Sequence, residues 1–207
     1  MNEAATIFID TADGGRIETD VFHGGPHAVC LFHGKRFDKN VWDGFVDDLL
    51  GAGFSVYAPN FRGYGRSTAG SAGADQYAID AAAVLAYAQG RCERVSALGA
   101  SMAGPTLLTG LCLLERPIAH LVLLSPAWEP PSGYDCLKDK ARDALLWYGE
   151  QEDYTAACAA IVKKLPFPVD VRVQASALHA HAYFNDPDLG SRLVQTILGY
   201  LNRALSS

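Results

Sequence analysis

Long apolar runs are absent from this sequence of 207 residues. The longest apolar stretches, residues 119–127 and 79–88, are shorter than the roughly 20 residues that a helix needs to cross a bilayer, and polar residues interrupt both. The first ten residues, MNEAATIFID, carry acidic side chains and lack the basic-then-apolar layout of a secretory signal. We therefore expect no membrane span and a cytoplasmic location.

An excess of basic residues is also missing. The 17 Lys and Arg residues are outnumbered by 23 Asp and Glu residues, which gives a formal net charge of -6. A protein that binds the phosphate backbone of a nucleic acid needs a basic surface. We therefore expect no nucleic-acid partner, while the charge alone leaves other partners and the oligomeric state open.

Cysteine occurs five times, an odd number, with no CxxC pair and no spacing typical of metal ligands. The simplest interpretation is a set of reduced thiols that are mostly buried as small apolar side chains. No metal site is predicted. The cysteines concerned are Cys30, Cys92, Cys112, Cys136 and Cys158.

The composition, with 49% apolar and 19% charged residues, is that of an ordinary globular protein. It has no internal repeat, no low-complexity tract and no linker. A chain of this length can build one sizeable core. We expect a single domain that covers residues 1–207.

Strand-like and helix-like segments alternate along the chain. Two short β-prone runs flank an Asp-Gly-Gly turn near the start and predict a hairpin. Strands separated by helices predict a mostly parallel sheet that is covered on both faces. The predicted strands after the hairpin are HAVCLF, FSVYAP, RVSALGA, AHLVLLSPA, ALLWYGE and VDVRVQA, and the predicted helices cover residues 40–50, 75–87, 105–115, 154–164 and 189–205.

One strand-to-helix junction contains a candidate nucleophile. Ser101 lies in the run Leu98-Gly99-Ala100-Ser101-Met102-Ala103-Gly104, with an apolar strand before it and an apolar helix after it. A sharp turn at this place projects a serine Oγ out of the sheet, and small neighbours let strand and helix approach closely. A serine at a helix N-terminus is alternatively a simple capping residue. The strand and helix around this motif favour the nucleophile.

This junction resembles the G-x-S-x-G elbow of the α/β-hydrolase family, with Ala103 where the second glycine is usual. Two loops resemble the same family: the strand followed by His33-Gly34, and the run NFRGYGRS, which is similar to D-x-R-G-x-G-x-S with Asn60 in place of Asp. The resemblance implies an α/β-hydrolase fold over nearly the whole chain. It also implies that His33 and the NFRGYGRS loop are structural.

The resemblance further implies two backbone N–H groups for an oxyanion, those of Lys35 and Met102. Negative charge develops on a carbonyl oxygen during acyl transfer, so such donors are needed. The Lys35 and Arg36 side chains are interpreted either as solvated loop charges or as a site for an anionic substrate.

The order Ser, acid, His in this family restricts the base to His179 or His181, in the run ALHAHAYF after the last predicted strand. His181 is preferred, because H-A-Y-F resembles the pattern after the catalytic histidine in small esterases and in enzymes like dienelactone hydrolase. His179 remains the alternative. The acid is expected after Gly149, where Glu152 has the usual spacing and Asp153 the commoner residue type; we prefer Asp153, with Glu152 as the alternative.

The expected activity is that of a serine hydrolase, a carboxylesterase-like enzyme that cleaves a small-molecule ester, thioester or lactone without a cofactor. Many relatives carry a cap domain between the strands that correspond to LVLLSPA and ALLWYGE, whereas this chain has only a short connection there. The site is therefore expected to be open and formed by loops. An acyltransferase with the same triad and a non-catalytic ligand-binding homologue remain alternative functions.

Overall fold

The computed structural model describes residues 4–71, 73 and 76–203. Its strands are β1 (Ala5–Asp10), β2 (Arg16–Phe22), β3 (His27–Phe32), β4 (Ser55–Pro59), β5 (Arg94–Ala100), β6 (Ile118–Leu124), β7 (Ala141–Gly149) and β8 (Val169–Gln174). Its α-helices are α1 (Asp43–Gly51), α2 (Gln76–Gln89), α3 (Ala103–Cys112), α4 (Thr155–Lys164) and α5 (Gly190–Asn202), and its 3₁₀ helices are η1 (Lys39–Trp42), η2 (Asp135–Leu137) and η3 (Ala180–Asn185).

The eight strands form one sheet in the order β1-β2-β4-β3-β5-β6-β7-β8. The hairpin of β1 and β2 is antiparallel, and β2 joins β4 antiparallel. The strands from β4 to β8 in this order are parallel to one another. The predicted fold class, a mostly parallel sheet behind an N-terminal hairpin, is confirmed.

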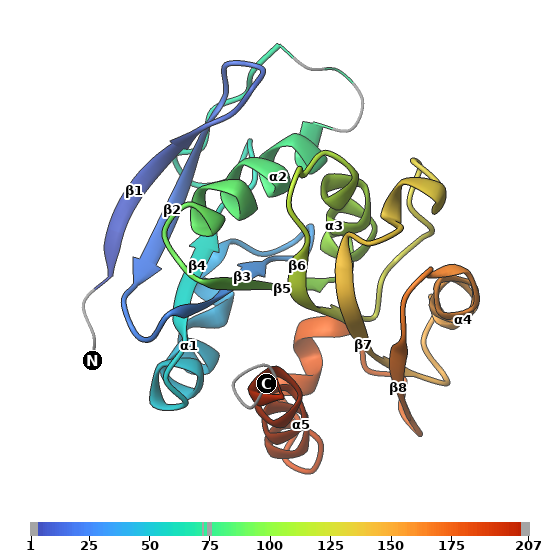
Figure 1. Cartoon of the computed structure of the whole chain (residues 1–207). Coiled ribbons are helices and arrows are strands. Elements are labelled where there is room, and N and C mark those ends of the chain that lie inside the picture. Colours follow the sequence, from blue (N-terminus) through green and yellow to red (C-terminus); the bar gives the residue numbers. More distant parts are fainter. Residues whose placement is uncertain (1–3, 72, 74–75, 204–207) are drawn as a thin grey trace.

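Helices cover both faces of the sheet, with α1 and α5 on one side and α2, α3 and α4 on the other (Figure 1). Strand β3 illustrates how the sheet packs against both helical layers. Its six residues are all buried, and they alternate between two cores: Ala28, Cys30 and Phe32 pack toward α2 and α3, whereas Val29 and Leu31 pack toward α1 and α5. Side chains of successive strand residues point to opposite faces, so a strand between two helical layers is apolar throughout.

The predicted helix boundaries are close to those observed, with two exceptions in the part of the chain that the structure describes. The helix expected from residue 105 begins at Ala103, and the one expected from residue 40 begins with η1 before α1. The predicted first residue of α2, Asp75, and the predicted last residue of α5, Leu205, lie outside the described residues.

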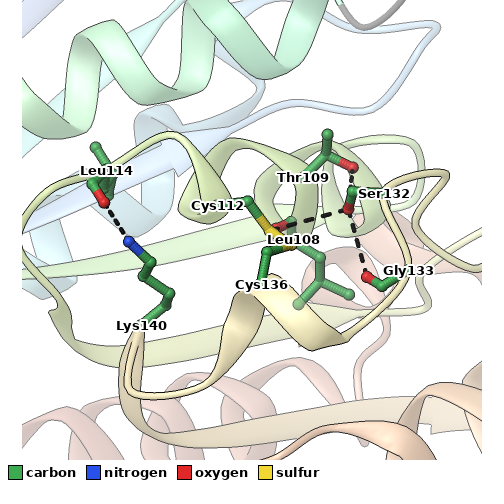
Figure 2. Close-up of a disulfide and its surroundings, with 8 residues drawn as sticks. All are labelled: Leu108, Thr109, Cys112, Leu114, Ser132, Gly133, Cys136 and Lys140. Atoms are coloured by element: carbon green, nitrogen blue, oxygen red, sulfur yellow. Dashed lines mark hydrogen bonds between the residues drawn. A yellow bond between two sulfur atoms is a disulfide. The ribbon is translucent and has the colours of Figure 1, made fainter.

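The expectation of five reduced thiols is wrong. Cys112, at the end of α3, and Cys136, in η2, form a disulfide (Figure 2). The fold brings their Cα atoms to 5.2 Å, within the range that a disulfide bridges. Cys30, Cys92 and Cys158 are free.

The disulfide links α3 to the connection between β6 and β7, which covers residues 125–140. Ser132 Oγ also donates to Thr109 Oγ1 at 3.3 Å, and the Lys140 ammonium donates to the Leu114 carbonyl (Figure 2). Within the described residues this short connection builds no separate cap domain, as predicted. None of the described helices has the length and apolar character needed to span a membrane.

Candidate active site

The candidate site lies at the carboxyl ends of the parallel strands. Ser101 follows β5, Ser125 follows β6, Glu152 lies three residues after the end of β7, and His179 follows β8. Because the carboxyl ends of parallel strands meet at one edge of the sheet, four segments distant in sequence converge there.

Ser101 lies on a tight turn between β5 and α3, with the positive φ of 55° that places a serine nucleophile above the sheet. The turn needs small neighbours. A Cβ at Gly99 would lie 2.6 Å from Leu107 Cδ1 and 2.9 Å from the Ala103 carbonyl oxygen, so strand and helix would be forced apart. Ala103 itself is fully buried, and its methyl group is accommodated. The absence of the second glycine therefore leaves the elbow intact.

His179 is the histidine that reaches the serine. Its Nε2 lies 2.8 Å from Ser101 Oγ, and its Nδ1 lies 2.5 Å from Glu152 Oε2. An ionised carboxylate only accepts hydrogen bonds, so Nδ1 carries the proton and Nε2 is left to accept the serine hydroxyl proton. Tyr154 packs over the imidazole with a distance of 4.7 Å between ring centroids.

Glu152 is held by more than the histidine. Its side chain is 1% exposed, and Oε1 accepts hydrogen bonds from the Ser125 hydroxyl and the Gly149 backbone N–H, each at 2.8 Å. Ser125 Oγ in turn accepts the Ala180 backbone N–H at 3.1 Å. Both oxygens of the buried carboxylate are therefore paired, which removes the large penalty of an unpaired buried charge.

This geometry favours His179 over His181, the base that the sequence pattern preferred. His179 has an extended backbone, but Ala180 has a φ of 49°, and the chain then enters η3. The turn at Ala180 directs the two histidines to different places. His181 is buried between Trp42 and Phe37, and its Nε2 accepts the Gly34 backbone N–H at 3.2 Å.

The geometry likewise favours Glu152 over Asp153, the acid that the sequence pattern preferred. Asp153 is exposed and lines the cavity beside the serine, and it forms no hydrogen bond or ion pair with another described residue. The glutamate has the position three residues after Gly149 that the family pattern indicated, and its longer side chain reaches the imidazole.

The two expected oxyanion donors lie beside the serine. Lys35 and Met102 line the same cavity as Ser101, and neither backbone N–H donates to another described residue. A Cβ at Gly34 would lie 3.4 Å from Ser101 Cβ, so the loop before Lys35 packs directly against the elbow.

The cavity at the serine has a volume of about 850 Å³. Trp128, which is 46% exposed, and Tyr154 line it. The cationic residues Lys35 and Arg36 also line it, and neither forms an ion pair with a described residue. Tyr183 is fully buried in the core. Phe184 packs on Trp42 and Phe45, and Tyr134 donates to Glu129.

The NFRGYGRS loop forms buried ion pairs and hydrogen bonds with other segments of the fold. Arg62 pairs with Asp80 at 2.6 Å and with Asp13 at 2.7 Å, and all three are largely buried. Asn60, which stands where the family pattern has an aspartate, accepts the Lys39 N–H with Oδ1 and donates to Glu18 with Nδ2.

Ser125 was missed by the sequence analysis. It is a single polar residue directly after the apolar run LVLL of the predicted strand AHLVLLSPA, and nothing in that pattern distinguishes it. Its φ of 46° and its place beside Glu152 arise from the assembled sheet.

Comparison with known proteins places these observations in a family. The chain resembles a predicted CIB-like hydrolase from Thermoplasma acidophilum, with 21% identity over 97% of this chain and 99% of that one and a TM-score of 0.77. It resembles an esterase, EaEST, from Exiguobacterium antarcticum, with 18% identity over 96% and 100% of the two chains and a TM-score of 0.77. A dienelactone hydrolase from Anabaena variabilis is similar at 12% identity over 97% of each chain, with a TM-score of 0.75.

These identities are low, so the three structures support the fold alone. The family comparison goes further, because residues 21–203 match the family described as alpha/beta hydrolase fold, which is most of the chain. Together with the elbow at Ser101, this match shows that the chain belongs to the α/β-hydrolase family.

Proposed function

We propose that this protein is a serine hydrolase that cleaves a carboxylic ester, thioester or lactone through an acyl-enzyme. The observation that carries the proposal is the continuous chain of hydrogen bonds from Ser101 Oγ through the His179 imidazole to the Glu152 carboxylate. A nucleophile, a base and a group that orients the base are the three parts that acyl transfer requires.

In the proposed mechanism, the Ser101 hydroxyl proton passes to His179 Nε2 while Oγ attacks the substrate carbonyl. The negative charge on the resulting oxyanion faces the backbone N–H groups of Lys35 and Met102. His179 then protonates the departing alcohol or thiol, and the acyl group stays on Ser101. Water, deprotonated by His179, attacks this acyl-enzyme, and the acid product leaves.

Glu152 keeps the imidazole in the tautomer that has its free lone pair on Nε2, and it stabilises the imidazolium formed during each transfer. Its second oxygen, bonded to Ser125 and Gly149, fixes the carboxylate plane. The carboxylate therefore does not need to accept the proton itself.

The cavity supports a small or medium-sized substrate with an apolar part, because Phe37, Val41, Ala127 and Trp128 form much of its wall. A lactone and an ester react by the same steps, and the esterase and dienelactone hydrolase named above share the fold. The cytoplasmic location remains a prediction, and the Cys112–Cys136 disulfide leaves three of the five cysteines as free thiols.

The test is covalent labelling with a fluorophosphonate, followed by identification of the labelled peptide. The expected result is one phosphonyl group on Ser101 in the wild type, no labelling in Ser101→Ala, and labelling at least about a hundredfold slower in His179→Gln. Hydrolysis of a series of aryl esters and thioesters then gives the acyl preference. A folded wild type that neither reacts with the probe nor hydrolyses any of these substrates would contradict the proposal.

A further inference from the structure

Gly34, in the loop before the expected oxyanion donor Lys35, forms hydrogen bonds with two histidines that take no part in the proposed proton transfer. His33 Nδ1 lies 2.9 Å from the Gly34 carbonyl oxygen, and His181 Nε2 lies 3.2 Å from the Gly34 nitrogen. The two rings therefore contact the peptide groups on either side of the Gly34 Cα atom.

The hydrogen bonds assign a tautomer to each ring. His33 Nε2 accepts the Phe61 backbone N–H at 3.1 Å, so its proton is on Nδ1 and is donated to the Gly34 carbonyl. His181 Nε2 faces an N–H donor, so its proton is on Nδ1. Both rings are neutral in this arrangement.

The orientation of Gly34 decides where the Lys35 N–H points. The Gly34 carbonyl and the Lys35 N–H belong to one planar trans peptide, in which the two bonds point in opposite directions. Glycine has the freest backbone of any residue, so without restraint this peptide would rotate. A bond at the Gly34 nitrogen and another at its carbonyl restrain φ and ψ together.

We propose that His181 is a positioning residue of the oxyanion site, whose Nε2 holds the Gly34 N–H so that the Lys35 N–H faces the substrate oxyanion. This inference rests on the proposed serine hydrolase function. It gives a role to a histidine that lies two residues after the proposed base and lines the same cavity but forms no hydrogen bond with the Ser101 hydroxyl.

The surroundings of His181 suit an acceptor rather than a base. The residue is 4% exposed, and its ring centroid lies 4.3 Å from that of Trp42 and 4.7 Å from that of Phe37. Burial, together with the nearby His33 and His179, lowers the pKa of His181 to about 3. The ring therefore stays neutral and keeps its lone pair on Nε2 throughout the pH range in which a histidine base works.

Packing alone does not explain this histidine. Its Nδ1 is buried and has no hydrogen-bond partner among the described residues, so an apolar ring would fill the space between Trp42 and Phe37 without an unpaired donor. The Gly34 N–H is its one hydrogen-bond partner in the described part of the chain. That contact is the feature that an apolar ring cannot replace.

The first part of the test uses the wild type, labelled with 15N and studied by NMR without any substrate. The expected result is a proton on Nδ1 of His181, none on Nε2, and slow exchange of the Gly34 amide proton. A proton on Nε2 would overturn the proposal. This measurement does not depend on catalysis, so it tests the hydrogen bond between His181 and Gly34 even if the proposed function fails or a variant does not fold.

The second part compares His181→Phe, which keeps an aromatic ring but removes the acceptor, with His181→Gln, whose amide oxygen can accept. For an aryl ester, kcat of His181→Phe is expected to fall about tenfold to a hundredfold with KM within about twofold, because the lost donor acts in the transition state. The pH profile should keep its position, since His179 and Glu152 are untouched, and His181→Gln should recover part of the loss.

The third part follows the Lys35 and Met102 amide signals in the phosphonylated protein, in which a phosphonyl oxygen stands in for the oxyanion. Both signals should move in the wild type. In His181→Phe the change in the Lys35 amide signal should become smaller, while the change in the Met102 signal should persist. Met102 lies in the turn after β5, not in the loop that contains Gly34, which His181 contacts. An unchanged Lys35 shift, or a kcat within twofold of the wild type, would overturn the role of His181 and leave the proposed function standing.

Discussion

His179 Nε2 lies 2.8 Å from Ser101 Oγ, although 78 positions separate the two residues in the sequence. The contact exists because β5 and β8 end at the same edge of the sheet and the chain turns at Ala180 immediately after the histidine. The proposed chemistry depends on this contact and on the carboxylate behind it.

Ser125 offers a test of how the carboxylate is held. In Ser125→Ala, Glu152 Oε1 loses one of its two donors and the Ala180 N–H loses its acceptor. A buried donor left without a partner costs about 1–3 kcal/mol. We expect kcat to fall about tenfold and the melting temperature to drop by a few degrees. Steady-state kinetics and thermal melts measure both, and an unchanged kcat would show that Gly149 and His179 suffice to orient the carboxylate.

Gly104 tests the packing behind the elbow. A Cβ at this position would lie 2.6 Å from Pro126 Cβ, so Gly104→Ala should destabilise the fold by about 1–3 kcal/mol and disturb Ser101. The matched control is Gly199→Ala, at an exposed position of α5 with no atom within 4 Å of the new methyl group. This variant should be more stable than the wild type by about 0.5–1 kcal/mol. Urea denaturation gives both values, and equal effects at the two sites would contradict the close packing of Gly104 against Pro126.

The sequence pattern predicted most of the fold and part of the candidate site, and it failed at a few residues. Alternation of buried runs with amphipathic segments was enough to predict the parallel sheet, and the sequence around Ser101 was enough to predict the strand-to-helix turn on which it lies. The choice between His179 and His181 depended on the backbone at Ala180, whose positive φ is imposed by neighbouring segments and has no local signal such as a glycine. The 112–136 disulfide was hidden for a similar reason, since only the fold brings the two residues together.

The disulfide makes a prediction of its own. Without reduction, alkylation of the denatured protein should modify three thiols, those of Cys30, Cys92 and Cys158, and after reduction it should modify all five cysteines. A bridge over a sequence separation of 24 residues should stabilise the fold by about 3 kcal/mol, so Cys136→Ser should lower the free energy of unfolding by about that amount. Five alkylated thiols in the untreated protein would contradict the bridge.

Buried histidines should make the stability depend on pH. Burial, with His120 and Arg94 nearby, lowers the pKa of His27 to about 4, and that of His181 is lowered to about 3. The unfolded chain therefore binds more protons than the folded one below about pH 6.5, and stability should fall as the pH drops from 6.5 to 4. Each group contributes a slope of up to about 1.4 kcal/mol per pH unit.

His27 is the residue with which to measure this slope, because it lies away from the serine and donates or accepts only toward Ser96 in the described residues. The expected result is that His27→Gln loses less stability than the wild type between pH 6.5 and 4.5 in urea titrations. A difference in unfolding free energy between the two proteins that stays constant over this range would contradict the pKa assigned to His27.

The most direct test of the proposed triad compares two adjacent acids by the rate of fluorophosphonate labelling at Ser101. Glu152→Gln replaces the buried carboxylate that touches His179, and Asp153→Asn replaces the exposed one beside it. We predict that labelling slows about a hundredfold or more in Glu152→Gln and stays within about threefold of the wild type in Asp153→Asn. The reverse order, or equal rates in the two variants, would contradict the assignment of Ser101, His179 and Glu152 as the catalytic triad.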